Sequence, residues 1–288
     1  IADMALAALE RVQGKRFFLA AGFLGPHLPF VAPQKYWDLY DPERLPTPES
    51  AAPPPGSPPL IGNRSRELLR QYQGLPKKLP LDRETERQLV HGYYACVSFI
   101  DAQIGRLLDG LAARGLAGNT IVVITSDHGF QLGDHGRWGK ATNFELSTRV
   151  PLLVRVPGSD ATGKRTTSLV ELVGLYPTLC ELAGLPKPKH LQGSSFAARF
   201  DDPNRALRQT AFSQYSREGA TGHSVRTQAF RHTEWRDLET DVLRHRELYD
   251  HRINSREEHN LADKHGYTKK AEQLSRLLNR GWRKGIYE

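Results

Sequence analysis

The sequence predicts an α/β domain followed by a small antiparallel α+β subdomain. Residues 83–114 carry an apolar stripe at three- and four-residue spacing, which is typical of an amphipathic helix packed on a sheet. Residues 121–124, Ile-Val-Val-Ile, form a short β-branched run that favours a strand buried on both faces. Several short predicted strands and one last helix then follow in the carboxyl-terminal third. This order of elements is typical of a separate antiparallel sheet covered by a helix.

The remaining elements complete this outline. Residues 16–21 (Arg-Phe-Phe-Leu-Ala-Ala) predict another buried strand, and residues 41–80 predict a long proline-rich loop with a short helix near 66–72. Further along we expect a strand at 149–157, a helix at 169–185 that Pro177 kinks or restarts, strands at 210–215, 224–230 and 247–249, and a helix at 267–282. The boundary near residue 205 divides the chain into residues 1–204 and 205–288.

Composition sets broad limits on the function. The chain has 288 residues, of which 39% are hydrophobic and 25% charged, as in one large globular domain with a smaller appendage. Ile1 is followed at once by a helix-like stretch, so we expect the chain to begin inside a larger protein. No apolar run approaches the length of a membrane span. Cys96 and Cys180 stand alone in helical patterns and predict buried thiols, not ligands or nucleophiles.

The net charge of +8 and the pI near 9.5 favour an anionic partner, such as a sulfated glycan, a nucleic acid or an anionic lipid. The alternative is a solvated basic surface without a specific partner, because lysines and arginines are scattered among acidic residues.

Asp127 and His128 follow the predicted strand at 121–124 after only Thr125 and Ser126. Ligands of open α/β sheets lie outside the carboxyl ends of the strands, so a carboxylate and an imidazole there predict a site. Adjacent strand residues point to opposite faces, and the two side chains therefore converge only if the strand has already ended. Gly129 permits that turn. The alternative is a capping aspartate and a surface histidine in an ordinary loop.

His27 lies between two prolines, in Pro-His-Leu-Pro at residues 26–29, after the predicted strand at 16–21. Prolines restrict the backbone and so hold the histidine in one orientation, and a positioned histidine is a common general acid or base. The alternative is polar surface. Lys140 closes the glycine-rich stretch after His128. His27 and Lys140 both follow apparent strand ends, so we expect them to line the same pocket.

These motifs together resemble those of the type I sulfatases, and among them the iduronate-2-sulfatases. The resemblance is carried by residues 17–30, by Thr-Ser-Asp-His-Gly through Lys140 and by Asn143-Phe-Glu, and it continues to Glu247-Leu-Tyr-Asp. It implies an alkaline-phosphatase-like fold, in which a mixed sheet lies between helices and a small antiparallel subdomain follows.

The same resemblance implies a role for each candidate residue. Asp127 and His128 would bind one divalent metal, calcium in the sulfatases. His27 and Lys140 would contact the sulfate, with His27 donating a proton to the leaving alcohol. A metal and a lysine would supply positive charge where negative charge develops on the sulfate oxygens. The imidazole is less usual for calcium and leaves manganese or another metal open.

The sequence departs from the family at the nucleophile. Sulfatases use a formylglycine made from cysteine in Cys-x-Pro-Ser-Arg, and neither Cys96 nor Cys180 stands in such a stretch. The family's amino-terminal Asp-Asp pair is absent as well. We therefore expect this chain to correspond to the carboxyl-terminal portion of a sulfatase and to be inactive by itself. The missing segment would be lost or would lie in a separate chain. Ala141 replaces the aromatic residue of the iduronate enzymes and puts that specificity in question.

Two other functions stay open. One is a phosphonate or phosphate monoester hydrolase of the same superfamily, and the other is a non-catalytic protein that binds sulfated glycan. The expected partner is a sulfated sugar or another sulfate ester, with no nucleic acid and no membrane span. Family members are lysosomal or extracytoplasmic, and the sequence does not assign a compartment.

Overall fold

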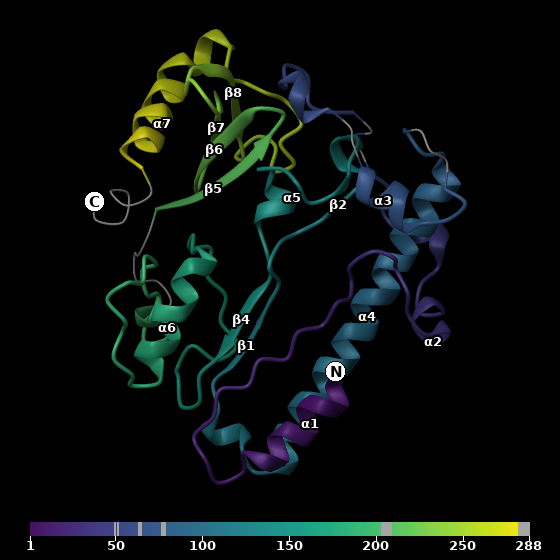
Figure 1. The fold of residues 1–288 in the computed structure, drawn as a ribbon, viewed down its shortest axis with the longest axis vertical. Helices are drawn as coiled ribbons and strands as arrows, with labels where there is room; N and C mark the ends of the chain where they lie inside the picture. The colour runs from purple at the N-terminus through teal and green to yellow at the C-terminus, as the bar shows by residue number, and fades with distance from the viewer. Residues whose placement is uncertain (49, 51, 63–64, 76–78, 203–208, 282–288) are drawn as a thin grey trace. The chain divides into compact units, whose positions relative to one another are not determined.

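The computed structural model describes residues 1–288 except 49, 51, 63–64, 76–78, 203–208 and 282–288 (Figure 1). The chain divides into two compact units. The helical unit comprises Ile1–Ala52, Asn63–Val122 and Gln131–Gly139. The sheet unit comprises Pro53–Gly62, Val123–Phe130 and Lys140–Glu288. The predicted boundary between residues 204 and 205 lies outside the described residues.

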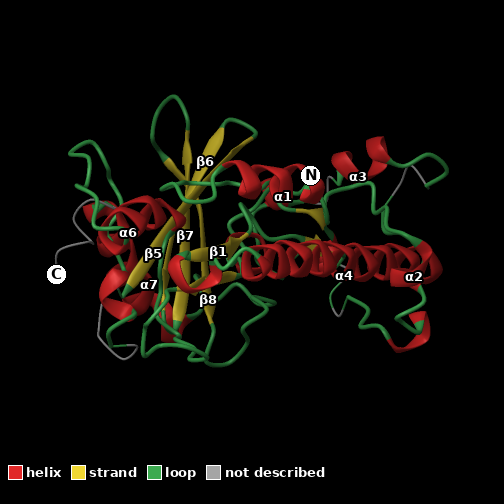
Figure 2. Cartoon of the chain, turned by 90° about the horizontal axis from the view of Figure 1, so that it is seen from below, coloured by secondary structure: helices red, strands yellow, loops and turns green. Residues whose placement is uncertain are grey.

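The helical unit is built on the long helix α4 (Arg83–Ala113), as the apolar stripe predicted. Asp82 caps its first turn by accepting a 2.8 Å hydrogen bond from the Thr85 amide, and Arg114 ends it. Helix α1 (Ala2–Arg11) runs along α4 (Figure 2), and α2 (Gln34–Trp37) also packs on it. Gly110 permits the close approach of α1, because a Cβ there would collide with Leu6.

Smaller elements complete the helical unit. They are η1 (Pro42–Arg44), α3 (Arg66–Gln71), η3 (Ala117–Asn119), the paired strands β2 (Gln131–Leu132) and β3 (Trp138–Gly139), and η4 (Asp134–Gly136). Helix α3 confirms the short helix expected inside the proline-rich loop.

The predicted strand at residues 16–21 is wrong. The segment pairs with no strand in the described part of the chain and is largely exposed, with Phe18 at 84%. Apolar, β-branched or aromatic composition indicates a strand only where a neighbouring strand completes the backbone hydrogen bonds, and sequence does not show that neighbour.

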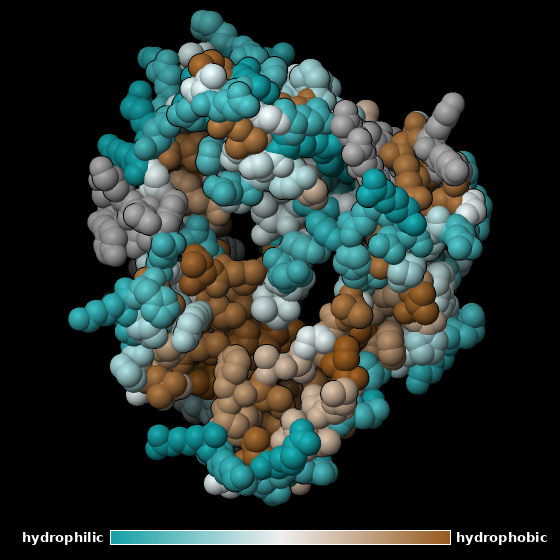
Figure 3. All heavy atoms as spheres, in the orientation of Figure 1, coloured by the Kyte–Doolittle hydropathy of each residue, from teal (hydrophilic) through white to brown (hydrophobic). Residues whose placement is uncertain are grey.

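The sheet unit begins with the paired strands β1 (Val122–Thr125) and β4 (Leu152–Arg155), which confirm the strands predicted near 121–124 and 149–157. Among the described residues, β1 and β4 form a two-stranded sheet, which is the part of the predicted mixed sheet that they contain. Both are only half-buried, in contrast to the full burial that we predicted for β1. Figure 3 shows apolar side chains gathered on the surface over β1, β4 and α6. Leu153, Val173 and Tyr176 of the sheet unit are each more than half exposed.

The sheet unit also contains several short helical segments. They are η2 (Pro59–Ile61), α5 (Glu145–Thr148), η5 (Leu172–Gly174), α6 (Leu175–Leu182) and η6 (Ala197–Arg199). Pro177 lies in the first turn of α6, so the predicted helix restarts there after η5.

The carboxyl-terminal part of the sheet unit is the predicted antiparallel α+β arrangement. Strands β5 (Thr210–Arg217), β6 (Ala220–Thr227), β7 (Phe230–Asp237) and β8 (Leu243–Asp250) pair in that order. After η7 (His265–Tyr267), helix α7 (Thr268–Arg280) covers one face of this sheet (Figure 1). The core beneath α7 contains Val225, Leu248 and Leu274, and a second core on the sheet contains Phe144 and Trp235.

Two other predictions bear on function. Cys96 and Cys180 are buried free thiols, as expected, and burial raises the pKa of Cys96 to about 11. Among the described residues, no helix combines the length and the apolar character needed to cross a membrane.

Candidate functional site

The Asp127–His128 loop begins where β1 ends, so the strand no longer forces its side chains to opposite faces. The His128 amide donates to Asp127 Oδ1 at 3.0 Å, and the Ser126 hydroxyl donates to the His128 carbonyl at 2.7 Å. These bonds fold the loop on itself and bring His128 Nε2 to 3.5 Å from Asp127 Oδ2. The structure therefore brings the two side chains together, and their role as metal ligands stays a prediction.

The donor set fits a cation in part. His128 Nδ1 lies 2.8 Å from the Gly129 carbonyl oxygen, which can only accept, so Nδ1 carries a proton. In the neutral ring Nε2 then keeps the lone pair that a metal ligand needs. A histidine that binds a metal characteristically donates its other ring N–H in this way. The Asp127 side chain is 85% exposed and open to a ligand. Calcium takes six to eight oxygen ligands as a rule, so this pair would supply only part of its coordination shell.

Gly129 holds this loop against α5. Its amide donates to the Ser147 carbonyl at 2.9 Å. A Cβ at position 129 would collide with the carbonyl oxygen of Leu146. The glycine is needed here because two backbones approach closely, a reason additional to the turn that the sequence suggested.

His27 lies in a loop of the helical unit that is anchored by its buried neighbours Leu28 and Phe30. Its Nδ1 donates to the Leu28 carbonyl at 2.8 Å, and its Nε2 lies 2.9 Å from a carboxylate oxygen of Glu67 on α3. Both ring nitrogens thus face acceptors, and the side chain has one orientation. The sequence did not point to Glu67, because it is one of several acidic residues in a proline-rich stretch and the contact spans 40 positions.

Lys140 is half-buried at the start of the segment that leads into α5, and its carbonyl accepts from the Thr142 amide at 2.8 Å. Lys140 belongs to the sheet unit together with Asp127 and His128, whereas His27 belongs to the helical unit. The shared pocket of His27 and Lys140 stays a prediction.

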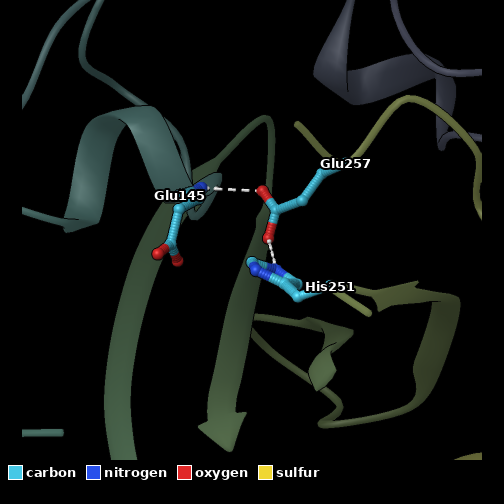
Figure 4. Close-up of side chains that lie close together, drawn as sticks. All are labelled: Glu145, His251 and Glu257. Atoms are coloured by element: carbon cyan, nitrogen blue, oxygen red, sulfur yellow. Dashed lines mark hydrogen bonds and ion pairs between the residues drawn. The ribbon is translucent and has the colours of Figure 1, made fainter. Parts of the chain in front are cut away.

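A second group of potential metal ligands lies in the sheet unit. Glu145, His251 and Glu257 each offer one ligand atom, and these atoms lie within 4.8 Å of one another (Figure 4). Glu257 bridges the other two: its Oε2 accepts from the Glu145 amide at 2.7 Å, and its Oε1 lies 2.8 Å from His251 Nε2. The Glu145 carboxylate points away from this bridge in Figure 4.

Arg231 already supplies the cation for these carboxylates. Its Nε donates to Glu257 Oε1 and its Nη2 to Glu145 Oε2, each at 2.6 Å. Burial raises the pKa of both carboxyls, but Arg231 outweighs it, together with Arg226 at Glu145 and His251 at Glu257, and both pKa values are lowered. The ionised pair and the arginine satisfy one another, and a metal ion there would be repelled by a buried positive charge. The geometry thus favours Asp127 and His128 over this group as metal ligands.

Comparison with solved structures defines the class of this fold. The phosphonate monoester hydrolase from Silicibacter pomeroyi is similar with a TM-score of 0.85 and 26% identity, over 99% of this chain and 59% of that chain. A second protein, solved in complex with its substrate D-glucosamine-2-N,6-O-disulfate, is similar with a TM-score of 0.82 and 23% identity. The match covers 99% of this chain and 69% of that chain. The fold is therefore alkaline-phosphatase-like, as the resemblance predicted.

The sequence comparisons identify the family. Residues 1–185 match the sulfatase family, and residues 133–284 match the family described as N-sulphoglucosamine sulphohydrolase, C-terminal. The chain belongs to the sulfatase family, which confirms the prediction made from its motifs.

Curated relatives agree with this assignment. Iduronate 2-sulfatase of Mus musculus is 32% identical over 81% of this chain and 54% of its own length. A sulfatase of Formosa agariphila is 33% identical over 91% of this chain and 49% of its own length. The chain thus spans about half the length of these relatives.

Proposed function

We propose that this chain carries the metal-binding and sulfate-binding part of a sulfuric ester hydrolase that acts on a sulfated sugar. The observation that carries the proposal is the convergence of Asp127 Oδ2 and His128 Nε2 at 3.5 Å, with the histidine tautomer fixed by the Gly129 carbonyl. Membership of the sulfatase family and the similarity to iduronate 2-sulfatase support the reaction type.

Each residue has a distinct role in this proposal. Asp127 and His128 hold one divalent metal, calcium by family resemblance. The bound ion would supply positive charge to the sulfate oxygens. The Lys140 ammonium adds a second positive charge to the same anion. In this role His27 Nε2 leaves its 2.9 Å contact with Glu67 and gives its proton to the leaving alcohol. Nδ1 stays on the Leu28 carbonyl and keeps the ring oriented.

The nucleophile is not among these residues. The sequence holds no Cys-x-Pro-Ser-Arg stretch, and so no precursor of a formylglycine. Residues that act together in catalysis lose almost all activity when one is removed. We therefore infer that the 288-residue chain by itself does not turn over sulfate esters.

The test compares the 288-residue chain with a version extended at the amino terminus to contain a Cys-x-Pro-Ser-Arg segment, with a sulfated monosaccharide and calcium. Turnover by the extended form alone, and its loss in Lys140→Ala, is the expected result. Equal turnover by both forms would show that the nucleophile has been misassigned. No turnover by either form, with sulfated glycan still bound, would favour a binding protein.

A second candidate is a phosphonate or phosphate monoester hydrolase. It is favoured by the similarity to the phosphonate monoester hydrolase from Silicibacter pomeroyi, with its TM-score of 0.85. The same extended protein, assayed with matched sulfate and phosphonate esters of one phenol, separates the two. We expect faster turnover of the sulfate ester, and a preference for the phosphonate would replace the first proposal by the second.

A further inference from the structure

Arg231 is a buried guanidinium in the middle of the carboxyl-terminal sheet. It lies on β7 and is only 3% exposed. Besides the two 2.6 Å ion pairs with Glu145 and Glu257, its Nη2 donates to the Thr148 hydroxyl at 3.0 Å. Two of these three partners, Glu145 and Thr148, are the first and last residues of α5. Arg231 therefore clamps this short helix at both ends.

Glu257 adds a backbone contact to the same helix. Its Oε2 accepts from the Glu145 amide, one of the amides at the start of α5 that lack a partner within the helix (Figure 4). Its Oε1 is held by Arg231 and by His251. A four-residue helix has little stability of its own, so these contacts and not its own hydrogen bonds fix its position.

Asn143 fixes the segment just before α5 to the same sheet. Its side-chain amide donates to the Gly222 carbonyl on β6 at 2.9 Å, and its carbonyl oxygen accepts from the Ser213 hydroxyl on β5 at 3.0 Å. Asn143 is 5% exposed and lies three residues after Lys140. The carboxyl-terminal sheet thus holds the stretch from Asn143 into α5.

Helix α5 in turn contacts the loop of the predicted metal ligands. The Ser147 carbonyl accepts from the Gly129 amide at 2.9 Å, directly beside His128. Gly129 has no room for a side chain against this helix, so a displacement of α5 would be transmitted to the loop.

We propose that Arg231 and Glu257 are positioning residues that fix, through α5, the loop of the Asp127–His128 pair. This inference rests on the proposed function, because the positioning matters for the reaction only if Asp127 and His128 bind the metal. The sheet supplies no group to the substrate, but it holds the groups that do. The buried ion pairs fix the position of α5 relative to the carboxyl-terminal sheet. Buried charges can specify such an alignment in proteins.

The experiment measures amide hydrogen exchange and calcium binding in the 288-residue chain. The test variants are Arg231→Met and Glu257→Gln. Arg236→Met is the matched control, because Arg236 pairs with the buried Glu234 at 2.8 Å on the face of the same sheet that contacts Ser275 of α7. Asp127→Asn tests the metal site directly.

We expect faster exchange of the Gly129 amide in Arg231→Met and not in Arg236→Met. We also expect calcium binding roughly tenfold weaker in both test variants, a typical effect of removing a residue that orients metal ligands. If Arg231→Met does not fold, Thr148→Val keeps both ion pairs and removes the hydrogen bond from Arg231 to α5, together with the one that the Thr148 hydroxyl donates to the Phe144 carbonyl, so the same Gly129 readout applies.

The outcomes separate the two claims. Unchanged Gly129 exchange and calcium affinity in Glu257→Gln, together with weaker calcium binding in Asp127→Asn, would overturn the positioning inference alone. Calcium binding unchanged in Asp127→Asn would overturn the proposed metal site, and the exchange of Gly129 would still decide whether Arg231 fixes the loop.

Discussion

We expect the stability of the sheet unit to fall as the pH rises from about 4.5 to about 7, because of Glu247. This carboxyl is 3% exposed on β8, where it accepts 2.6 Å hydrogen bonds from Trp235 Nε1 and the Tyr249 hydroxyl. Burial outweighs these two donors and raises its pKa from 4.5 to about 7.

The sign and size follow from this shift. In the unfolded chain Glu247 loses its proton near its ordinary pKa, whereas the folded protein keeps it until about pH 7. The folded state therefore binds more protons between these values, so the stabilisation is full below pH 4.5 and is lost as the pH passes 7. Each pKa unit corresponds to about 1.4 kcal/mol, so the whole change is about 3 kcal/mol.

The assay is urea unfolding at pH 5, 6, 7 and 8 of the natural chain and of Glu247→Gln. Glutamine resembles the neutral carboxyl and has no proton to lose. We expect the variant to lack this part of the pH dependence and to be the more stable protein at pH 8. The reasoning is refuted if both proteins show the same pH dependence, since other groups would then account for it.

Three further predictions concern single side chains, each measured by unfolding in urea. Gly129→Ala introduces a Cβ that collides with the Leu146 carbonyl, so we expect a loss of about 1–3 kcal/mol, and an unchanged stability would contradict the close approach. Leu248→Ala opens a cavity at a fully buried position in the core beneath α7, with an expected loss of about 2–5 kcal/mol; a loss well below this range would mean that the core is loosely packed. Asp82→Ala removes the cap of α4 and is expected to lower the stability, whereas Asp82→Ser retains an acceptor and serves as its control.

Local patterns predicted the elements whose determinants lie within a few residues. The stripe at 83–114 predicted α4 to within one residue, because the periodicity of an amphipathic helix is specified by neighbours in sequence. The β-branched run predicted β1 and the place where it ends, and hence the position of Asp127 and His128. Burial was predicted less well, because it depends on what packs against the strand.

Contacts between distant residues left no signal in the sequence. Glu67 reaches His27, and Arg231 reaches Glu145 and Glu257, across 40, 86 and 26 positions. Each is a charged residue among many, and only the folded chain shows which of them are buried and paired. The separate strands β6 and β7 were likewise predicted as one piece at 224–230, because the tight turn between them lies inside that range.

The most direct test of the central claim is a crystal structure of the chain grown with manganese, with the metal located by its anomalous scattering. We predict a peak within about 2.0–2.6 Å of both Asp127 Oδ2 and His128 Nε2, distances at which divalent metals bind oxygen and nitrogen ligands. A peak between Glu145 and Glu257, with Arg231 displaced and nothing at Asp127, would contradict both the assignment of the metal ligands and the role given to Arg231.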